Sequence, residues 1–125
     1  RIYDKAFNVS EFTGAHMQIA NELMYLPLQI RPTAIFCYND ATALQLQLVA
    51  KRLALRIPED ISIIGFDDGP IGDFRDVLTT FAHPKEEVGR KAVEILLDML
   101  NGGKPQKVVL EPELIERSSI TKAKS

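Results

Sequence analysis

Two pairs of polar residues, Asn39-Asp40 and Asp67-Asp68, each follow a short run of apolar residues. The runs cover 33–38 and 61–66, and their length and continuity are typical of strands buried on both faces of a sheet. In an open parallel sheet, ligands bind beyond the carboxyl ends of the strands. We therefore expect both pairs at one rim, where amides and carboxylates exchange hydrogen bonds with hydroxyl groups such as those of a sugar.

These pairs also have a purely structural interpretation. Asn39 or Asp40 suits the N-cap of a helix, and Asp67-Asp68-Gly69 suits a turn. The residues alone favour neither interpretation over the other.

An enzymatic interpretation is weaker. A pair of aspartates at a strand end can hold Mg²⁺ or accept a phosphoryl group. That chemistry also requires a Lys near the strand ends and a Ser or Thr at another strand end, and the sequence places neither. His16 and His83 lack the spacing of metal ligands, no Gly-rich phosphate loop opens a helix, and the lone Cys37 lies in an apolar run typical of a core residue. We predict no catalysis, no metal and no cofactor.

The elements that must position these residues alternate between strand and helix. A helix from residue 39 or 40 to about Leu53, with Ala41, Leu44 and Leu48 on one side, joins the two apolar strands into a right-handed βαβ unit. This unit predicts the α/β fold class, a parallel sheet flanked by helices. Upstream, the pattern predicts a short strand over 1–7 and a helix over about 11–24.

From residue 79 the pattern changes. Residues 79–82 are prone to form a strand, Pro84 suits the first position of a helix, and Asn101-Gly102-Gly103 ends that helix. Residues 108–110 and 114–118 are predicted to be extended. The helix carries a wide apolar stripe: Val88, Ala92, Ile95, Leu96 and Met99.

Composition limits the possible partners. Of the 125 residues, 46% are hydrophobic and 26% are charged, as in a globular domain. The net charge is −2, and no basic run is longer than two residues, so this segment is not expected to bind nucleic acid itself. No apolar stretch approaches the roughly 18 residues that span a membrane, so no membrane contact is expected.

Five motifs in order resemble those of the LacI/GalR family of bacterial transcription regulators. Residues 31–43 resemble the segment P-T-A-hydrophobic-x-x-x-N-D-x-x-A, and 55–68 resemble the signature that ends in S-v-v-G-F-D-D. Leu78-Thr79-Thr80 matches L-T-T. The helix motif P-x-x-x-x-G-x-x-A matches at Pro84, Gly89 and Ala92, and L-x-x-R-x-S matches 114–119. The resemblance covers about 7–120.

The resemblance implies an effector domain like a periplasmic binding protein, with two α/β lobes, a cleft and three hinge crossings. Residues 1–78 would form the C-terminal lobe, 79–112 a crossing and part of the N-terminal lobe, and 113–125 the return crossing and tail. The expected protein is a cytoplasmic homodimer that binds a small-molecule effector, a sugar, and contacts DNA only through an N-terminal domain missing from this chain. The dimer surface would include Leu44, Leu48 and Phe74, unless both leucines simply pack on the sheet.

The resemblance also implies effector-binding residues. The polar cleft positions of the family correspond to Asn39 and Asp67, and His83 stands where many relatives carry Gln. The position of the family's stacking aromatic is Val9 here, which leaves Phe7 as the nearest substitute. The Tyr38-Asn39-Asp40 and His83-Pro84 variants look most like arabinose-type repressors, while other sugars or a purine stay open.

A different class of protein shares this fold. A secreted solute-binding protein of a sugar transport system is the alternative, and the P-E-D-I-S and R-S-S features favour the regulator.

Overall fold

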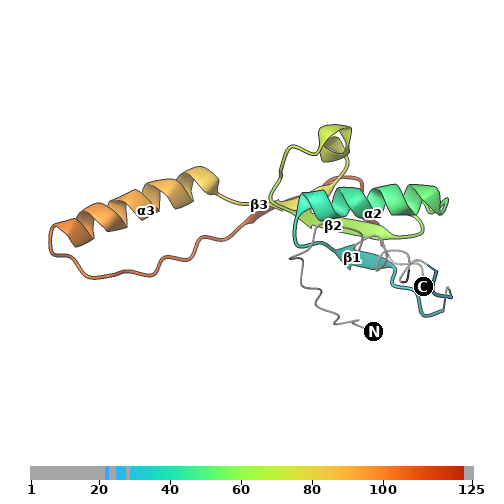
Figure 1. The fold of residues 1–125 in the computed structure, drawn as a ribbon, viewed down its shortest axis with the longest axis horizontal. Coiled ribbons are helices and arrows are strands. Elements are labelled where there is room, and N and C mark those ends of the chain that lie inside the picture. The colour runs from blue at the N-terminus through green and yellow to red at the C-terminus, as the bar shows by residue number, and fades with distance from the viewer. Residues whose placement is uncertain (1–21, 23–24, 28, 123–125) are drawn as a thin grey trace.

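In the computed structural model, the described residues are 22, 25–27 and 29–122 (Figure 1). The strand and helix predicted upstream, and Phe7, therefore lie outside the described part, apart from residue 22 of the predicted helix. The described elements follow the predicted alternation: β1 (Ala34–Phe36), α2 (Asp40–Arg52), β2 (Ser62–Phe66), a 3-10 helix η1 (Gly72–Asp76), β3 (Thr79–Ala82), α3 (Lys85–Leu100) and β4 (Glu113–Ile115).

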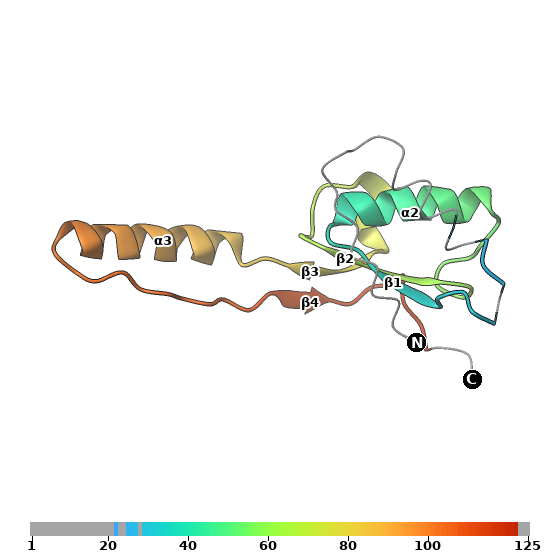
Figure 2. The same cartoon turned by 60° about the horizontal axis from the view of Figure 1, so that its bottom comes forward.

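The strands form one sheet in the order β1-β2-β3-β4. β1 pairs parallel with β2, and β2 pairs parallel with β3, with Ile63 opposite Ile35 and Thr80 opposite Gly65. β3 pairs antiparallel with β4. The predicted β1-α2-β2 unit and the α/β fold class are confirmed, and α2 lies across one face of the sheet (Figures 1 and 2).

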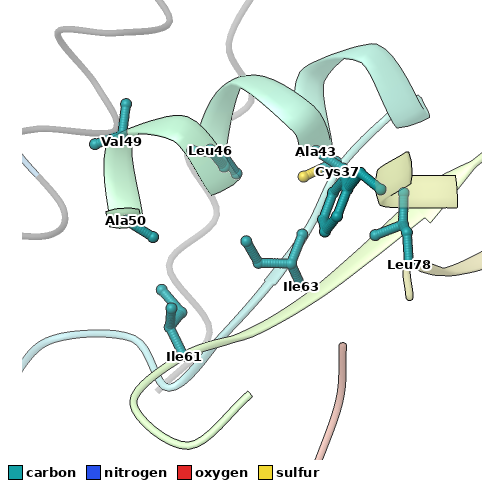
Figure 3. Packing of buried hydrophobic residues seen from close by; sticks show 9 residues of the cluster. Cys37, Ala43, Leu46, Val49, Ala50, Ile61, Ile63 and Leu78 are labelled. Atoms are coloured by element: carbon teal, nitrogen blue, oxygen red, sulfur yellow. The ribbon is translucent and has the colours of Figure 1, made fainter. Parts of the chain in front are cut away.

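The core lies between α2 and the sheet, as Figure 3 shows. Leu46 and Ala50 of α2 point toward Ile63 and Ile61 (Figure 3), and the same buried cluster also contains Ala43, Val49, Cys37, Phe74 and Leu78. Of the leucines predicted to share one side of this helix, Leu48 is 45% exposed and does not pack on the sheet, whereas Leu44 is partly buried against the core. The residues of α2 that face the sheet are Ala43, Leu46, Val49 and Ala50.

Two further expectations need correction. Among the described strands, β1 lies at an edge of the sheet and has one covered face: Ile35 and, directly after the strand, Cys37 pack in the core, whereas Ala34 is exposed and Phe36 is 59% exposed. Its apolar run therefore does not reflect burial on both faces. Residues 108–110 are not part of any strand, because β4 begins only at Glu113.

Beyond the sheet, β3 and β4 lead out to α3, which stands apart from α2 and the core (Figure 2). The helix begins at Lys85, directly after Pro84, and ends at Leu100 before Asn101 and Gly102, whose φ is +89°. None of its residues is buried, so the apolar stripe faces solvent and does not fold back on the core. Among the described residues, no helix is both long and apolar enough to cross a membrane.

Candidate functional site

The loop after β2 has an unusual backbone. Asp67 has a φ of 111° and Asp68 a φ of 47°, in the region that disfavours side chains. Aspartate tolerates such angles better than most residues, because its short carboxylate can bond locally, but two in succession require external support. The Asp67 N–H donates to the Phe81 carbonyl at 2.8 Å, which continues the ladder with β3 one residue beyond the strand.

Asp67 meets His83 at the point where β3 ends. The Asp67 Oδ1 and His83 Nε2 atoms are 3.1 Å apart, and each side chain is 42% exposed. The His83 ring packs edge-on against Phe66, with 4.5 Å between the ring centroids. Lys85 Nζ donates to the Asp67 carbonyl oxygen at 2.9 Å. A carboxylate, an imidazole and an ammonium group therefore gather at one place, with polar atoms accessible to a ligand.

These groups line an open depression of about 460 Å³, within the usual size range of small-molecule sites. Its walls come from the loop after β2, the end of β3 and the first turn of α3, which bring acidic and basic side chains together. The lining residues are Asp67, Asp68, Ala82, His83, Pro84, Lys85, Glu86 and Glu87.

Asn39 has the structural role that the sequence left open. Its Oδ1 accepts from the Thr42 N–H at 2.8 Å, which makes it the N-cap of α2. Capping uses the oxygen and not the amide nitrogen, so the role is compatible with donation to a ligand. Asn39 does not line the depression, and Phe7 lies outside the described residues.

Asp40 is not a cap but a buried support for the loop. It is the first residue of α2 and is 2% exposed. Its Oδ2 accepts from the Gly69 N–H at 2.8 Å, and its Oδ1 accepts from the Thr80 hydroxyl at 2.6 Å. A Cβ at Gly65 would collide with that same carboxylate, so glycine is needed there to leave it room.

Asp68 joins the loop to two arginines. Its Oδ1 accepts from Arg117 and its Oδ2 from Arg75, each at 2.9 Å. The hydrogen bond from Arg75, with that from Arg117, lowers the pKa of Asp68 below its ordinary value of 3.8, against the opposing effect of burial. Because the folded pKa is lowered, the stabilisation is present above the ordinary value and is lost as the pH falls through the lowered pKa.

Cys37 is buried, as predicted for a core residue. Burial, with a smaller contribution from the nearby Asp40, raises the pKa of its thiol to about 12, so the thiolate needed for nucleophilic chemistry is scarce at neutral pH.

Within the described ranges, no group of three or more His, Cys, Asp or Glu residues could hold a metal ion. Lys85 does supply a lysine at the strand ends, which the sequence did not reveal.

Residues 4–120 match the model of the periplasmic binding protein-like domain. The chain belongs to this family. It is 41% identical over 107 residues to the arabinose metabolism transcriptional repressor of Geobacillus stearothermophilus, a match that covers 82% of this chain and 29% of the repressor. It is 46% identical over 97 residues to the HTH-type transcriptional repressor PurR of Vibrio vulnificus, covering 75% of this chain and 29% of PurR.

Solved structures of LacI family regulators agree. A regulatory protein from Chloroflexus aggregans has a TM-score of 0.74 and 34% identity, over 85% of this chain and 39% of that one. A Lactobacillus casei regulator with bound sucrose has a TM-score of 0.68 and 27% identity, over 83% of this chain and 39% of that one. The predicted resemblance to LacI-type regulators is confirmed. The chain spans less than a third of the length of these curated relatives.

In this periplasmic-binding-protein-like chain, the motifs meet at the loop after β2. Asp40 of N-D holds Gly69, Gly65 of G-F-D-D makes room for Asp40, and Thr80 of L-T-T donates to it. Arg117 of R-x-S holds Asp68. Sequence reasoning found these motifs but missed the roles of Lys85 and Arg117, because their partners are 18 and 49 residues away in the chain.

Proposed function

We propose that this chain is the effector-sensing and dimerisation part of a cytoplasmic LacI-type transcription regulator. A small sugar would bind beside Asp67 and His83 and change the DNA affinity of a separate domain. The observation that carries the proposal is the pairing of Asp67 with His83 at the rim of the sheet, at the mouth of an open depression.

The chemistry suits hydroxyl groups. The Asp67 carboxylate can accept hydrogen bonds from sugar hydroxyls, the His83 imidazole can donate or accept, and the Asn39 amide can donate. Asp67 follows β2, and His83 follows β3 directly before α3. A ligand that contacts both residues would therefore connect the loop after β2 with the segment that leads to α3. Such a bridge favours one orientation of the two parts, which is the basis of allosteric control.

The same proposal assigns the residues of the chain to the two lobes of the effector domain and to the crossings between them. Residues 1–78 form most of the C-terminal lobe, 79–112 a crossing and a segment of the N-terminal lobe, and 113–125 the return crossing and tail. The cleft would then lie between the loop after β2 and the first turn of α3, and Phe7 would contribute the stacking surface. The antiparallel pairing of β3 with β4 supports two neighbouring crossings.

An arabinose-like sugar is the first candidate effector, because one relative is named for arabinose metabolism and a structural neighbour holds sucrose. A secreted solute-binding protein is the alternative. The similarity to transcriptional repressors favours the regulator.

The test is a thermal-shift and calorimetric screen of sugars and purine bases on the full-length protein, followed by Asp67→Ala. A specific ligand raises the Tm through mass action. Removal of the Asp67 carboxylate should weaken binding by about 1–3 kcal/mol, roughly 5- to 150-fold, because buried ligand hydroxyls lose their acceptor. Asp73→Ala, which removes an exposed carboxylate of η1, is the matched control. Unchanged affinity in Asp67→Ala would remove this residue from the site.

A further inference from the structure

Arg117 joins three segments that are far apart in the sequence. Its Nη2 donates to Asp68 Oδ1 at 2.9 Å, in the loop after β2, and its Nη1 donates to the Leu78 carbonyl at 2.8 Å, directly before β3. Arg117 itself follows β4 by two residues. One guanidinium therefore ties the loop that carries Asp67 to the base of both strands that lead to α3.

The backbone of Arg117 is fixed as well. Its N–H donates to Thr79 Oγ1 at 2.9 Å, and its carbonyl accepts from the same hydroxyl at 3.0 Å. Ser119, two residues on, accepts from the Thr79 N–H and donates to the Ile63 carbonyl. The segment after β4 is thus hydrogen-bonded to the start of β3 and to β2. A displacement of the Asp68 carboxylate would therefore act, through Arg117, on the part of the sheet where β3 begins.

The two arginines that bind Asp68 differ in solvent exposure. The Arg117 side chain is 20% exposed, whereas the Arg75 side chain on η1 is 51% exposed. Ion pairs of exposed side chains contribute little, because solvent screens them and the side chains lose entropy. The pair with Arg117 is shielded, and the planar guanidinium serves two acceptors at once, which a lysine cannot do in the same geometry.

We propose that Arg117 is a positioning residue that couples the effector loop to the crossing strands. This inference rests on the proposed function: the effector contacts Asp67, its neighbour Asp68 moves with it, and Arg117 transmits that movement to the base of β3 and β4. The residue acts on the response to the effector and not by contact with it. Loss of Arg117 should therefore separate effector affinity from effector response.

The experiment uses the full-length regulator with the sugar that stabilises it most in the screen. Effector affinity is measured by calorimetry, and operator affinity with and without sugar by fluorescence anisotropy. For Arg117→Gln and Arg117→Lys we expect the sugar-induced change in operator affinity to fall at least fivefold, while sugar affinity and sugar-free operator affinity change less than threefold. Arg75→Gln, which removes the exposed partner of the same carboxylate, should reduce the response less than either Arg117 variant. Arg56→Gln, which breaks an exposed ion pair with Asp60 outside the loop, should leave all three within twofold.

A double-mutant cycle and hydrogen exchange complete the test. Asp68→Asn should reproduce the loss of response, and Asp68→Asn with Arg117→Gln should be no worse than either alone, because both changes break one link. In the absence of sugar, Arg117→Gln should speed amide exchange at 67–69 at least tenfold and Arg56→Gln should not. A full response in either Arg117 variant, additive losses in the cycle, or unchanged exchange at 67–69 would overturn the inference.

These readouts keep the two proposals distinguishable. A wild-type protein that binds no sugar or purine contradicts the proposed function, and exchange at 67–69 then decides whether Arg117 positions the loop. A wild-type protein that binds and responds, with Arg117 variants that respond equally, contradicts this inference alone. If Arg117→Gln fails to fold, Arg117→Lys and Asp68→Asn test the same link from either side.

Discussion

At the scale of single residues, one buried carboxylate explains why three motifs distant in the sequence occur together. Asp40 reaches from the start of α2 to the Gly69 N–H and the Thr80 hydroxyl, and it lies over Gly65. A buried carboxylate is costly unless donors surround it, so its position is strongly specified. The loop with two successive positive φ angles is held by the Asp40 carboxylate at Gly69 and by Arg75 and Arg117 at Asp68.

The first prediction follows from that crowding. In Gly65→Ala, the new methyl group would collide with the Asp40 carboxylate and would lie 2.9 Å from Leu78 Cδ2. Both neighbours are buried and fixed, so overpacking should lower the free energy of unfolding by about 1–3 kcal/mol. Urea denaturation measures the change.

Two comparisons make that measurement specific. Gly89→Ala, in α3 with nothing within 4 Å of the added Cβ, should be neutral or stabilising by up to about 1 kcal/mol, since glycine weakens a helix interior. In an Asp40→Ser background, the cost of Gly65→Ala should shrink. An equal cost in both backgrounds would show that Asp40 is not the neighbour that excludes a side chain.

At the scale of elements, the sequence predicts what depends on local pattern and misses what depends on neighbours. The run at 61–66, the helix stops at 101–103 and the strand at 79–82 were predicted because length, glycine and β-branched residues act locally. The inner face of α2 was not, because leucine, valine and alanine occur all around this helix. The strand-end rule predicted that Asp67 lies at the rim of the sheet, whereas Lys85 and Arg117 reach their partners only after folding.

The observed orientation of α2 refines the dimer prediction. Leu48 is 45% exposed, whereas Leu44 packs partly against the core, so Leu48 is the cleaner probe of an outer apolar surface. If α2 lies in the proposed homodimer interface, Leu48→Lys should raise the dimer dissociation constant at least tenfold, because a buried ammonium lacks a partner. Leu48→Met, which keeps the apolar volume, should not. Light scattering over a dilution series measures both, and a Leu48→Lys protein as dimeric as wild type would exclude this surface.

At the scale of the whole molecule, the described residues form a hydrophobic core under α2 and a helix, α3, with no buried residue. The core packs between α2 and the sheet, while α3 stands at the far end of the extended segments that follow β3 and precede β4 (Figures 1 and 2). The exposed apolar side chains of α3 include Val88, Val93, Leu96, Leu97, Met99 and Leu100. α3 is amphipathic: charged residues form ion pairs along one side, and apolar residues are exposed to solvent. Helices with this pattern usually pack their apolar face against another surface.

The last prediction is that this chain, studied alone, associates through α3 and does not sense a sugar with high affinity. Exposed apolar patches drive association, and the proposed cleft has only the first turn of α3 as its second wall. Sedimentation equilibrium should give a mass above that of a monomer. Replacement of Leu96 and Leu97 by Lys should shift the chain toward the monomer, whereas Glu94→Gln, which leaves the apolar surface intact, should not. A well-behaved monomer that binds a sugar with micromolar affinity would show that α3 needs no partner and that this chain already forms a complete site.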